Sequence, residues 1–181
     1  MRKYISYRIF KPFFTIITKL TLGCFMTNTK PYRPNVCAII VSSAYPDKTE
    51  IFIAERSDIK GVWQFPQGGI DRGESPKEAL YRELKEEIGT DKIKIIAEYP
   101  DWIAYDFPEH VMETMKPFYG QTQRYYLVRL KKKAVINLDT KHPEFVKYKY
   151  VPLDEAMEIM AELKKPVYSK VIEYFKSEGY L

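Results

Sequence analysis

Residues 68–89, GGIDRGESPKEALYRELKEEIG, form a glycine-rich turn followed by one clearly delimited helix. Ser75 is a favoured N-cap residue, Pro76 suits the first helical position, and Gly89 permits a left-handed C-terminal stop. One apolar stripe recurs every fourth residue and indicates a single buried face: Leu80, Leu84 and Ile88. The pattern predicts a helix over residues 76–88 that packs one side against a core.

A second stripe on the same helix is acidic. Glu83, Glu86 and Glu87 are three and four residues apart, and like charges at this spacing cost an isolated helix a few tenths of a kcal/mol per pair. A solvated acidic face is the ordinary interpretation of such a stripe. The glycine-rich approach WQFPQGG (residues 63–69) and Arg82 among the acids favour a different one. Clustered carboxylates are ligands for Mg²⁺ or Mn²⁺, usually shared with water and substrate phosphates.

The spacing of the charged residues and glycines resembles the Nudix box, the signature of hydrolases that act on nucleoside diphosphates linked to another moiety. The matching positions are Gly68, Glu74, Arg82, Glu83, Leu84, Glu86, Glu87 and Gly89. Thr90 departs from the pattern, which has an aliphatic residue there, and we expect this position to pack rather than react. The resemblance implies an α/β fold, a Nudix-type α/β/α sandwich with a mixed β-sheet between helices.

Composition is consistent with one globular domain in a chain of 181 residues. The formal charge of +5 does not indicate nucleic-acid binding by the whole domain. Five of the 29 basic residues and none of the 24 acidic residues lie within residues 1–25, so the remainder carries 24 of each. Phosphate recognition is therefore expected to be local, and DNA is not an expected partner. Two cysteines and two histidines provide neither a disulfide framework nor a histidine-based site, which fits the cytoplasm.

The segment of residues 1–25 is basic and apolar, but its apolar run is much shorter than the roughly 20 residues of a membrane-spanning helix. A cleavable signal and a basic membrane-surface helix are two interpretations. We favour a third, in which Met26 is the true start and residues 30–181 form a single domain. Membrane contact is then expected only if residues 1–25 are retained. The sequence does not determine the oligomeric state.

Hydrophobic periodicity predicts a strand-rich order with helices in the middle and at the end. Pro166 is expected to separate two C-terminal helices, and a long loop is expected over residues 106–119. A basic run, Arg129 and Lys131 to Lys133, is interpreted as a solvated edge. The predicted strands are 36–41, 50–56, 62–65, 93–98, 102–105, 123–130 and 147–151, and the predicted C-terminal helices are 153–164 and 167–178.

Four further stretches resemble the bacterial RNA 5′-pyrophosphohydrolase group: YRPNV (32–36), WQFPQGGI (63–70), GQTQR (120–124) and PEF (143–145). This resemblance implies removal of pyrophosphate from 5′-triphosphorylated RNA, which leaves a monophosphate end and promotes mRNA decay. The alternative is hydrolysis of dinucleoside polyphosphates such as diadenosine tetraphosphate. A binding module that keeps the fold without turnover is a third hypothesis, which the intact acids of the box disfavour.

The resemblance also implies roles for individual residues. The catalytic and metal-binding acids are Glu83, Glu86, Glu87 and Glu144, and the carbonyl of Gly68 completes a shell around Mg²⁺, with Mn²⁺ or Zn²⁺ as other candidates. The sequence does not choose which glutamate accepts the proton of the attacking water. The candidate substrate-binding residues are Arg33, Gln67, Gln123 and Lys164, although Leu163 stands where an RNA-processing relative has an aromatic residue. Arg82 and Glu74 are expected to orient the acids.

Overall fold

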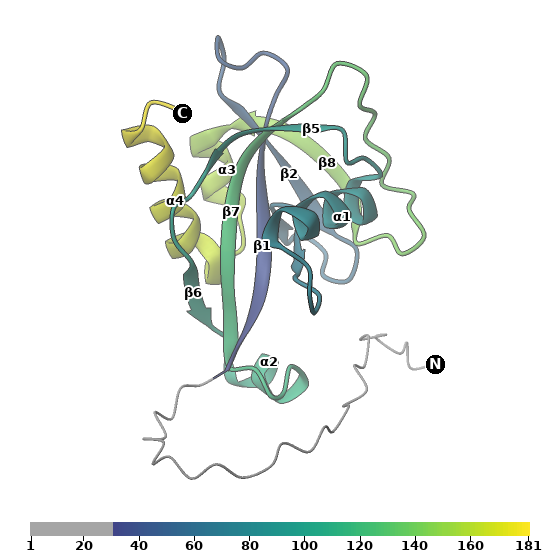
Figure 1. Ribbon diagram of the computed structural model, residues 1–181, viewed down its shortest axis with the longest axis vertical. Coiled ribbons are helices and arrows are strands. Elements are labelled where there is room, and N and C mark those ends of the chain that lie inside the picture. Colours follow the sequence, from purple (N-terminus) through teal and green to yellow (C-terminus); the bar gives the residue numbers. More distant parts are fainter. Residues whose placement is uncertain (1–30) are drawn as a thin grey trace.

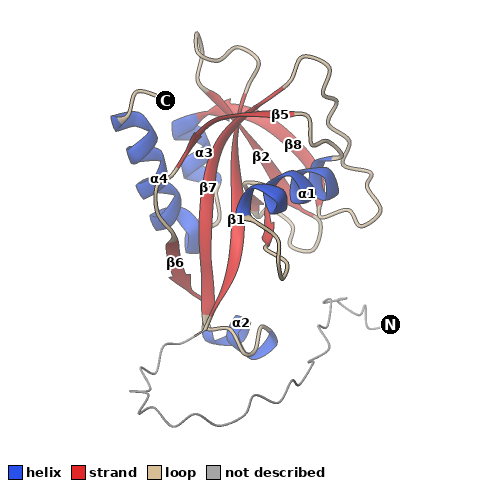
Figure 2. Cartoon of the chain, in the orientation of Figure 1, coloured by secondary structure: helices blue, strands red, loops and turns tan. Residues whose placement is uncertain are grey.

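The computed structural model describes residues 31–181, so the predictions for residues 1–25 and Met26 lie outside the described residues. An eight-stranded sheet forms the centre of the molecule, with α1 (Pro76–Ile88) on one face and α3 (Leu153–Ile159) and α4 (Lys165–Ser177) on the other (Figure 1). This is the predicted α/β/α sandwich. Figure 2 shows the same layers by element type.

The sheet is mixed, as predicted, because β1 and β7 are parallel while the other pairings are antiparallel. Its main path runs β3-β2-β1-β7-β5, with β4 paired to β1, β6 to β7 and β8 to β2. The strands are β1 (Tyr32–Val41), β2 (Glu50–Arg56), β3 (Trp63–Gln64), β4 (Gln67–Gly69), β5 (Ile93–Glu98), β6 (Ile103–Asp106), β7 (Gly120–Leu130) and β8 (Phe145–Pro152).

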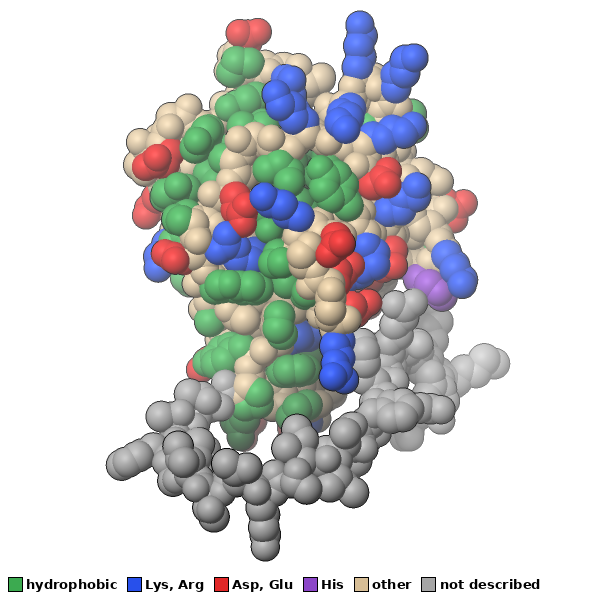
Figure 3. Space-filling model, in the orientation of Figure 1, with side chains coloured by type: hydrophobic (Ala, Val, Ile, Leu, Met, Phe, Trp, Pro, Cys, Tyr) green, Lys and Arg blue, Asp and Glu red, His purple; other side chains and the backbone are tan. Residues whose placement is uncertain are grey.

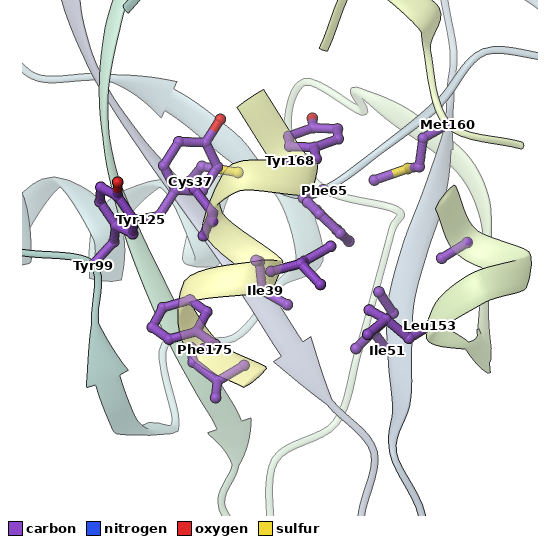
Figure 4. Close-up of a cluster of buried hydrophobic side chains, with 14 of the residues drawn as sticks. Cys37, Ile39, Ile51, Phe65, Tyr99, Tyr125, Leu153, Met160, Tyr168 and Phe175 are labelled. Carbon is purple, nitrogen blue, oxygen red and sulfur yellow. The ribbon is translucent and has the colours of Figure 1, made fainter. Parts of the chain in front are cut away.

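Strand β1 is buried on both faces from Val36 to Val41, which explains its continuous apolar sequence. Its side chains alternate between two cores. The core under α3 and α4 is rich in aromatic rings, among them Phe65, Tyr168 and Phe175 (Figure 4). The core under α1 receives the predicted apolar stripe of that helix, Leu80, Leu84 and Ile88.

Helix α1 begins and ends as its sequence predicts. The Ser75 hydroxyl accepts a hydrogen bond from the Glu78 amide, and the Glu78 carboxylate accepts one from the Ser75 amide, which completes a capping box. Gly89 adopts a left-handed φ of 73° at the C-cap. Thr90 is buried, as expected for a packing position. The most chemically distinctive helix of the chain is therefore held at both ends by local interactions.

Several predicted boundaries were wrong. The approach to α1 contains two short strands, and Gln67–Gly69 pairs with β1 instead of forming only a loop. The expected loop 106–119 contains a short helix, α2 (Glu109–Thr114). The predicted helix 153–164 stops at Ile159 and is followed by a 3₁₀ turn, η1 (Glu162–Lys164). Pro166 does not separate two helices, because it lies in the first turn of α4, where its missing N–H costs nothing.

The helices of the described chain are short, and α1 and α4 have 13 residues each. Among the helices of residues 31–181, none combines the length and the apolar character that crossing a bilayer requires.

Candidate active site

Strand β4 and helix α1 meet at Gly68, where backbone and carboxylate lie in very close contact. Gly68 pairs with Val36 of the central strand, which fixes its position in the sheet. A Cβ atom added to Gly68 would lie 1.8 Å from the carboxyl carbon of Glu83. Only glycine leaves room for this approach. The glycine of the motif therefore brings the backbone of the sheet next to a helical acid.

Arg82 connects the turn, the strand and the helix. Its Nε and Nη2 atoms donate to both carboxylate oxygens of Glu74 at 2.8 and 2.7 Å, and its Nη1 donates to Glu83 at 2.6 Å. Nη2 also donates to the carbonyl of Gly69 at 2.7 Å. The bond from Arg82 holds the pKa of Glu74 below its usual value. The guanidinium thus connects two acids and the backbone beside them, and its orienting role stays a prediction.

Glu87 is fully buried between α1 and the sheet. Its Oε2 accepts a hydrogen bond from the amide of Gln67 at 2.8 Å, whereas its Oε1 has no partner among the described residues. Burial raises the pKa of the Glu87 carboxyl well above its usual value, and repulsion from Glu144 and Glu83 raises it further. A buried carboxylate oxygen without a donor indicates a group that is completed by something outside the protein chain.

Burial also raises the pKa of Glu83, to about 7, although the neighbouring Arg82 opposes the shift. Glu86 differs, because its side chain is half exposed and its ion pair with Arg82 is long at 3.5 Å. The two acids therefore offer one carboxylate held by the protein and one free to move at the surface.

Glu144 approaches these acids from the loop before β8. The amide of Ser57 donates to the Glu144 carbonyl at 2.8 Å, and the Ser57 hydroxyl donates to the Pro143 carbonyl at 2.9 Å. Glu144 is exposed, but its carboxylate is close enough to raise the pKa values of Glu83 and Glu87 by repulsion. We call Glu83, Glu86, Glu87 and Glu144 the acidic cluster. Ser57, which anchors the fourth member, had no signal in the sequence.

Comparison with known proteins agrees with this geometry. A model of the NUDIX domain matches residues 31–175. The chain belongs to the Nudix family. It is therefore a member of a family of hydrolases that cleave phosphoanhydride bonds, as its helix and turn predicted.

Related Nudix proteins include an RNA pyrophosphohydrolase of Nitratiruptor, 64% identical over 83% of this chain and 97% of the relative. The RNA pyrophosphohydrolase of a Campylobacter jejuni strain is 58% identical, with coverage of 86% and 100%. Among solved structures, the dihydroneopterin triphosphate pyrophosphohydrolase of Escherichia coli has a TM-score of 0.62 at 18% identity, covering 78% of this chain and 98% of the other. This last likeness concerns the Nudix fold alone.

The acidic cluster of this Nudix chain suits a hard divalent cation. Buried Glu87 has an oxygen without a donor among the described residues, and the carboxylates repel one another, both of which a cation would relieve. Among residues 31–181, however, no three His, Cys, Asp or Glu side chains are already placed to hold a metal together. Metal binding therefore requires side-chain adjustment, for which exposed Glu86 and Glu144 have freedom. The family generally needs a divalent metal. The Gly68 backbone lies beside Glu83.

The predicted substrate-binding residues fall into two groups. A Cβ on Gly69 would lie 2.3 Å from Nη2 of Arg33, so this guanidinium lies directly over the turn that leads into α1. Gln123 is buried, and its amide nitrogen donates to Asn35 at 2.7 Å and to Gln67 at 3.3 Å. The Gln67 amide thus contacts Glu87, Arg33 lies over Gly69, and the amide of Gln123 is already engaged by protein. Asn35 was missed by sequence reasoning, although it lies inside the quoted motif YRPNV.

Lys164, the fourth predicted substrate-binding residue, lies inside the protein. Its ammonium is buried and donates to the Gln64 side chain at 3.0 Å. Burial lowers the pKa of Lys164 to about 8. This placement argues against a direct contact between its ammonium and a nucleobase at the surface. Leu163, its neighbour, is 43% exposed and offers an apolar surface instead.

Proposed function

We propose that this protein removes pyrophosphate from the 5′ end of triphosphorylated RNA and leaves a 5′-monophosphate. The observation that carries the proposal is the identity of 64% and 58% to proteins named RNA pyrophosphohydrolase, over nearly their whole length. The Gly68-Gly69 dipeptide supplies a chemical basis, because Glu83 of the acidic cluster lies against Gly68 and the Arg33 guanidinium lies against Gly69. Such a protein would act in the cytoplasm, where triphosphorylated transcripts are made.

Arg33 is the residue we assign to the substrate phosphates. Its guanidinium fork lies over Gly69, one residue from the Gly68 backbone that contacts Glu83. A planar guanidinium can donate two parallel hydrogen bonds to one phosphate group. Arg33 would therefore hold the triphosphate with its reacting anhydride facing the acidic cluster.

The four glutamates would divide the remaining work according to their exposure. Buried Glu87 and partly buried Glu83 are hydrogen-bonded to Gln67 and Arg82, respectively, and would serve as stationary ligands. Mg²⁺, or Mn²⁺ in its place, would polarise phosphate oxygens, lower the pKa of bound water and stabilise the leaving pyrophosphate. Exposed Glu86 and Glu144 can exchange protons with solvent, so one of these two would accept the proton of the attacking water.

One experiment tests the proposal directly. The full chain with Mg²⁺ is given triphosphorylated RNA and, in parallel, diadenosine tetraphosphate, and the released products are quantified. We expect pyrophosphate and monophosphorylated RNA to form at the higher kcat/KM. Rapid cleavage of diadenosine tetraphosphate without pyrophosphate release from RNA would assign the protein to dinucleoside polyphosphates instead.

A further inference from the structure

A basic depression lies at the end of the sheet, and none of the acidic cluster lines it. It has a volume of about 860 Å³ and lies where β1 and β7 finish, lined by four cationic side chains and by tyrosines of β8: Lys94, Arg129, Lys131, Lys132, Tyr148 and Tyr150. Figure 3 shows Lys and Arg side chains gathered at the upper end of the molecule. We call this surface the basic depression.

The four cationic side chains of the basic depression lie close together, and no acidic side chain of residues 31–181 neutralises their charge. Lys94 and Arg129 are direct cross-strand partners in β5 and β7, an arrangement in which like charges destabilise a sheet. All four cations are exposed, and none of them forms an ion pair within residues 31–181. Within the described chain, Glu50 is the only acid of the lining and is already paired with Lys48 at 2.6 Å. A bound polyanion would relieve this repulsion.

An exposed aromatic side chain stands beside these cations. Tyr148 is 42% exposed, and its ring stacks on buried Phe52 with centroids 5.2 Å apart. Tyr150 packs edge-on against Tyr148 at 6.5 Å. Phe52 therefore holds the Tyr148 ring in a fixed orientation with one side toward solvent. Fixed aromatic faces next to basic side chains are the combination that binds single-stranded nucleic acid.

Strand β8 connects the basic depression to the loop that carries Glu144 of the acidic cluster. Tyr148 follows Glu144 by four residues, about 13 Å of extended chain. Phe52, on which Tyr148 stacks, belongs to the core beneath α1, so Tyr148 lies on the face of the sheet that carries α1. An RNA strand whose 5′ end reacts at the acidic cluster could thus continue over Tyr148 to the end of the sheet, where Lys131 and Lys132 line the basic depression.

We propose that the basic depression binds the backbone of the RNA substrate downstream of its reacting 5′ end. This inference rests on the proposed function, since it assigns a second contact to the same substrate. The reacting triphosphate is held at Arg33 and the acidic cluster, while the following phosphodiesters pass Tyr148 and meet the four cations. Discrimination between long RNA and small phosphoanhydrides then originates at this second surface rather than at the acids.

The test compares two double variants of the full chain. Arg129→Gln with Lys132→Gln removes two cations of the basic depression, while Lys170→Gln with Lys176→Gln removes two exposed cations from α4 as a matched control. For a long triphosphorylated single strand, we expect the first pair to raise KM about fivefold to tenfold and the control pair to leave it unchanged. With a triphosphorylated dinucleotide, which is too short to reach the basic depression, neither pair should alter KM.

A binding measurement separates this inference from the proposed function. Fluorescence anisotropy with a 5′-hydroxyl single-stranded RNA reports binding without any reaction. The first pair should reduce the slope of log affinity against log salt concentration by about 1 to 2, and the control should not. Equal slopes for both pairs would show that the basic run is only a solvated edge and would overturn the inference. If wild-type protein released no pyrophosphate but the slopes differed, the proposed function alone would fail.

Discussion

The acidic cluster and the basic depression are two groups of like charges on one sheet. They differ in burial and in whether an opposite charge neutralises them. At the acidic end, Arg82 neutralises part of the charge, and burial fixes Glu83 and Glu87 in place. At the basic end, Lys94 and Arg129 are exposed and have no acidic partner among the described residues. A metal ion is bound only when its ligands are held at defined positions. A flexible polyanion can adapt to any concave basic surface. We therefore expect the acidic end to hold the reacting phosphates and the basic end to bind the RNA backbone.

The largest expected effect is a loss of turnover at the acidic end. Glu86→Gln should lower kcat by about 10²–10³-fold, because an amide neither accepts a proton nor neutralises a cation. Since the Glu86 side chain is half exposed, the free energy of unfolding should change by less than about 0.5 kcal/mol. Steady-state kinetics and urea unfolding measure the two quantities. Glu173→Gln on α4 is the control, and unchanged turnover in Glu86→Gln would favour a binding module without catalysis.

A smaller loss of kcat is expected when Arg82, which neutralises part of the acidic cluster, is replaced. Arg82→Lys keeps the charge but cannot bond Glu74, Glu83 and the Gly69 carbonyl at once. We expect kcat to fall about 10–100-fold and stability to fall by about 1–2 kcal/mol. Arg72→Lys, a change at an exposed arginine of the same turn, should alter neither quantity. A normal kcat in Arg82→Lys would mean that the acids do not depend on the several hydrogen bonds of the guanidinium for their orientation.

The pH dependence of the free energy of unfolding tests how much the negative charge of Glu83 destabilises the folded protein. Because burial raises the pKa of Glu83 to about 7, above its unfolded value, the metal-free folded state binds the proton more tightly. Stability should therefore fall as pH rises from about 4.5 to about 7, by about 1–3 kcal/mol. Glu83→Gln should flatten this decline, and Mg²⁺ should offset it most at the upper end of the range. Thermal unfolding in both conditions gives the values, and an equal slope in the variant would contradict the assignment.

The smallest expected effect concerns a single cation inside the protein rather than on its surface. Burial lowers the pKa of Lys164 to about 8, below its unfolded value, so the unfolded chain binds more protons between about pH 8 and 10.5. Wild-type stability should rise with pH across this window. Lys164→Met should lose that rise while changing stability near pH 7 by only about 1 kcal/mol. A large increase in KM with unchanged unfolding would instead support the substrate contact expected from sequence.

Local signals made the α1 region predictable from the sequence. The caps Ser75 and Gly89 and the apolar and acidic stripes each depend on residues within one or two turns of each other. The same holds for the apolar run of β1, whose burial on both faces leaves an uninterrupted hydrophobic stretch. These elements, and with them three of the four candidate acids, follow from the order of residues alone.

Contacts between distant residues could not be predicted. Ser57 fixes the loop of Glu144 through a backbone bond across the fold, and Gln64 meets Lys164 from 100 residues away. The pairing of Lys94 with Arg129 is likewise visible only in the strand register. Register and depth of burial are tertiary properties, and a single sequence carries little information on either.

The successive glycines of β4 have a consequence for redesign. The Glu83 carboxylate occupies the space that a side chain at residue 68 would fill, and the Arg33 guanidinium occupies the space at residue 69. Groups of opposite charge therefore lie against adjacent backbone positions. A side chain at residue 68 would displace the Glu83 carboxylate, and a side chain at residue 69 would displace the Arg33 guanidinium. A library that aims at new phosphoanhydride specificities should leave residues 68 and 69 constant and place its diversity in the turn 131–133, where lengthening or recharging the chain leaves the chemistry intact.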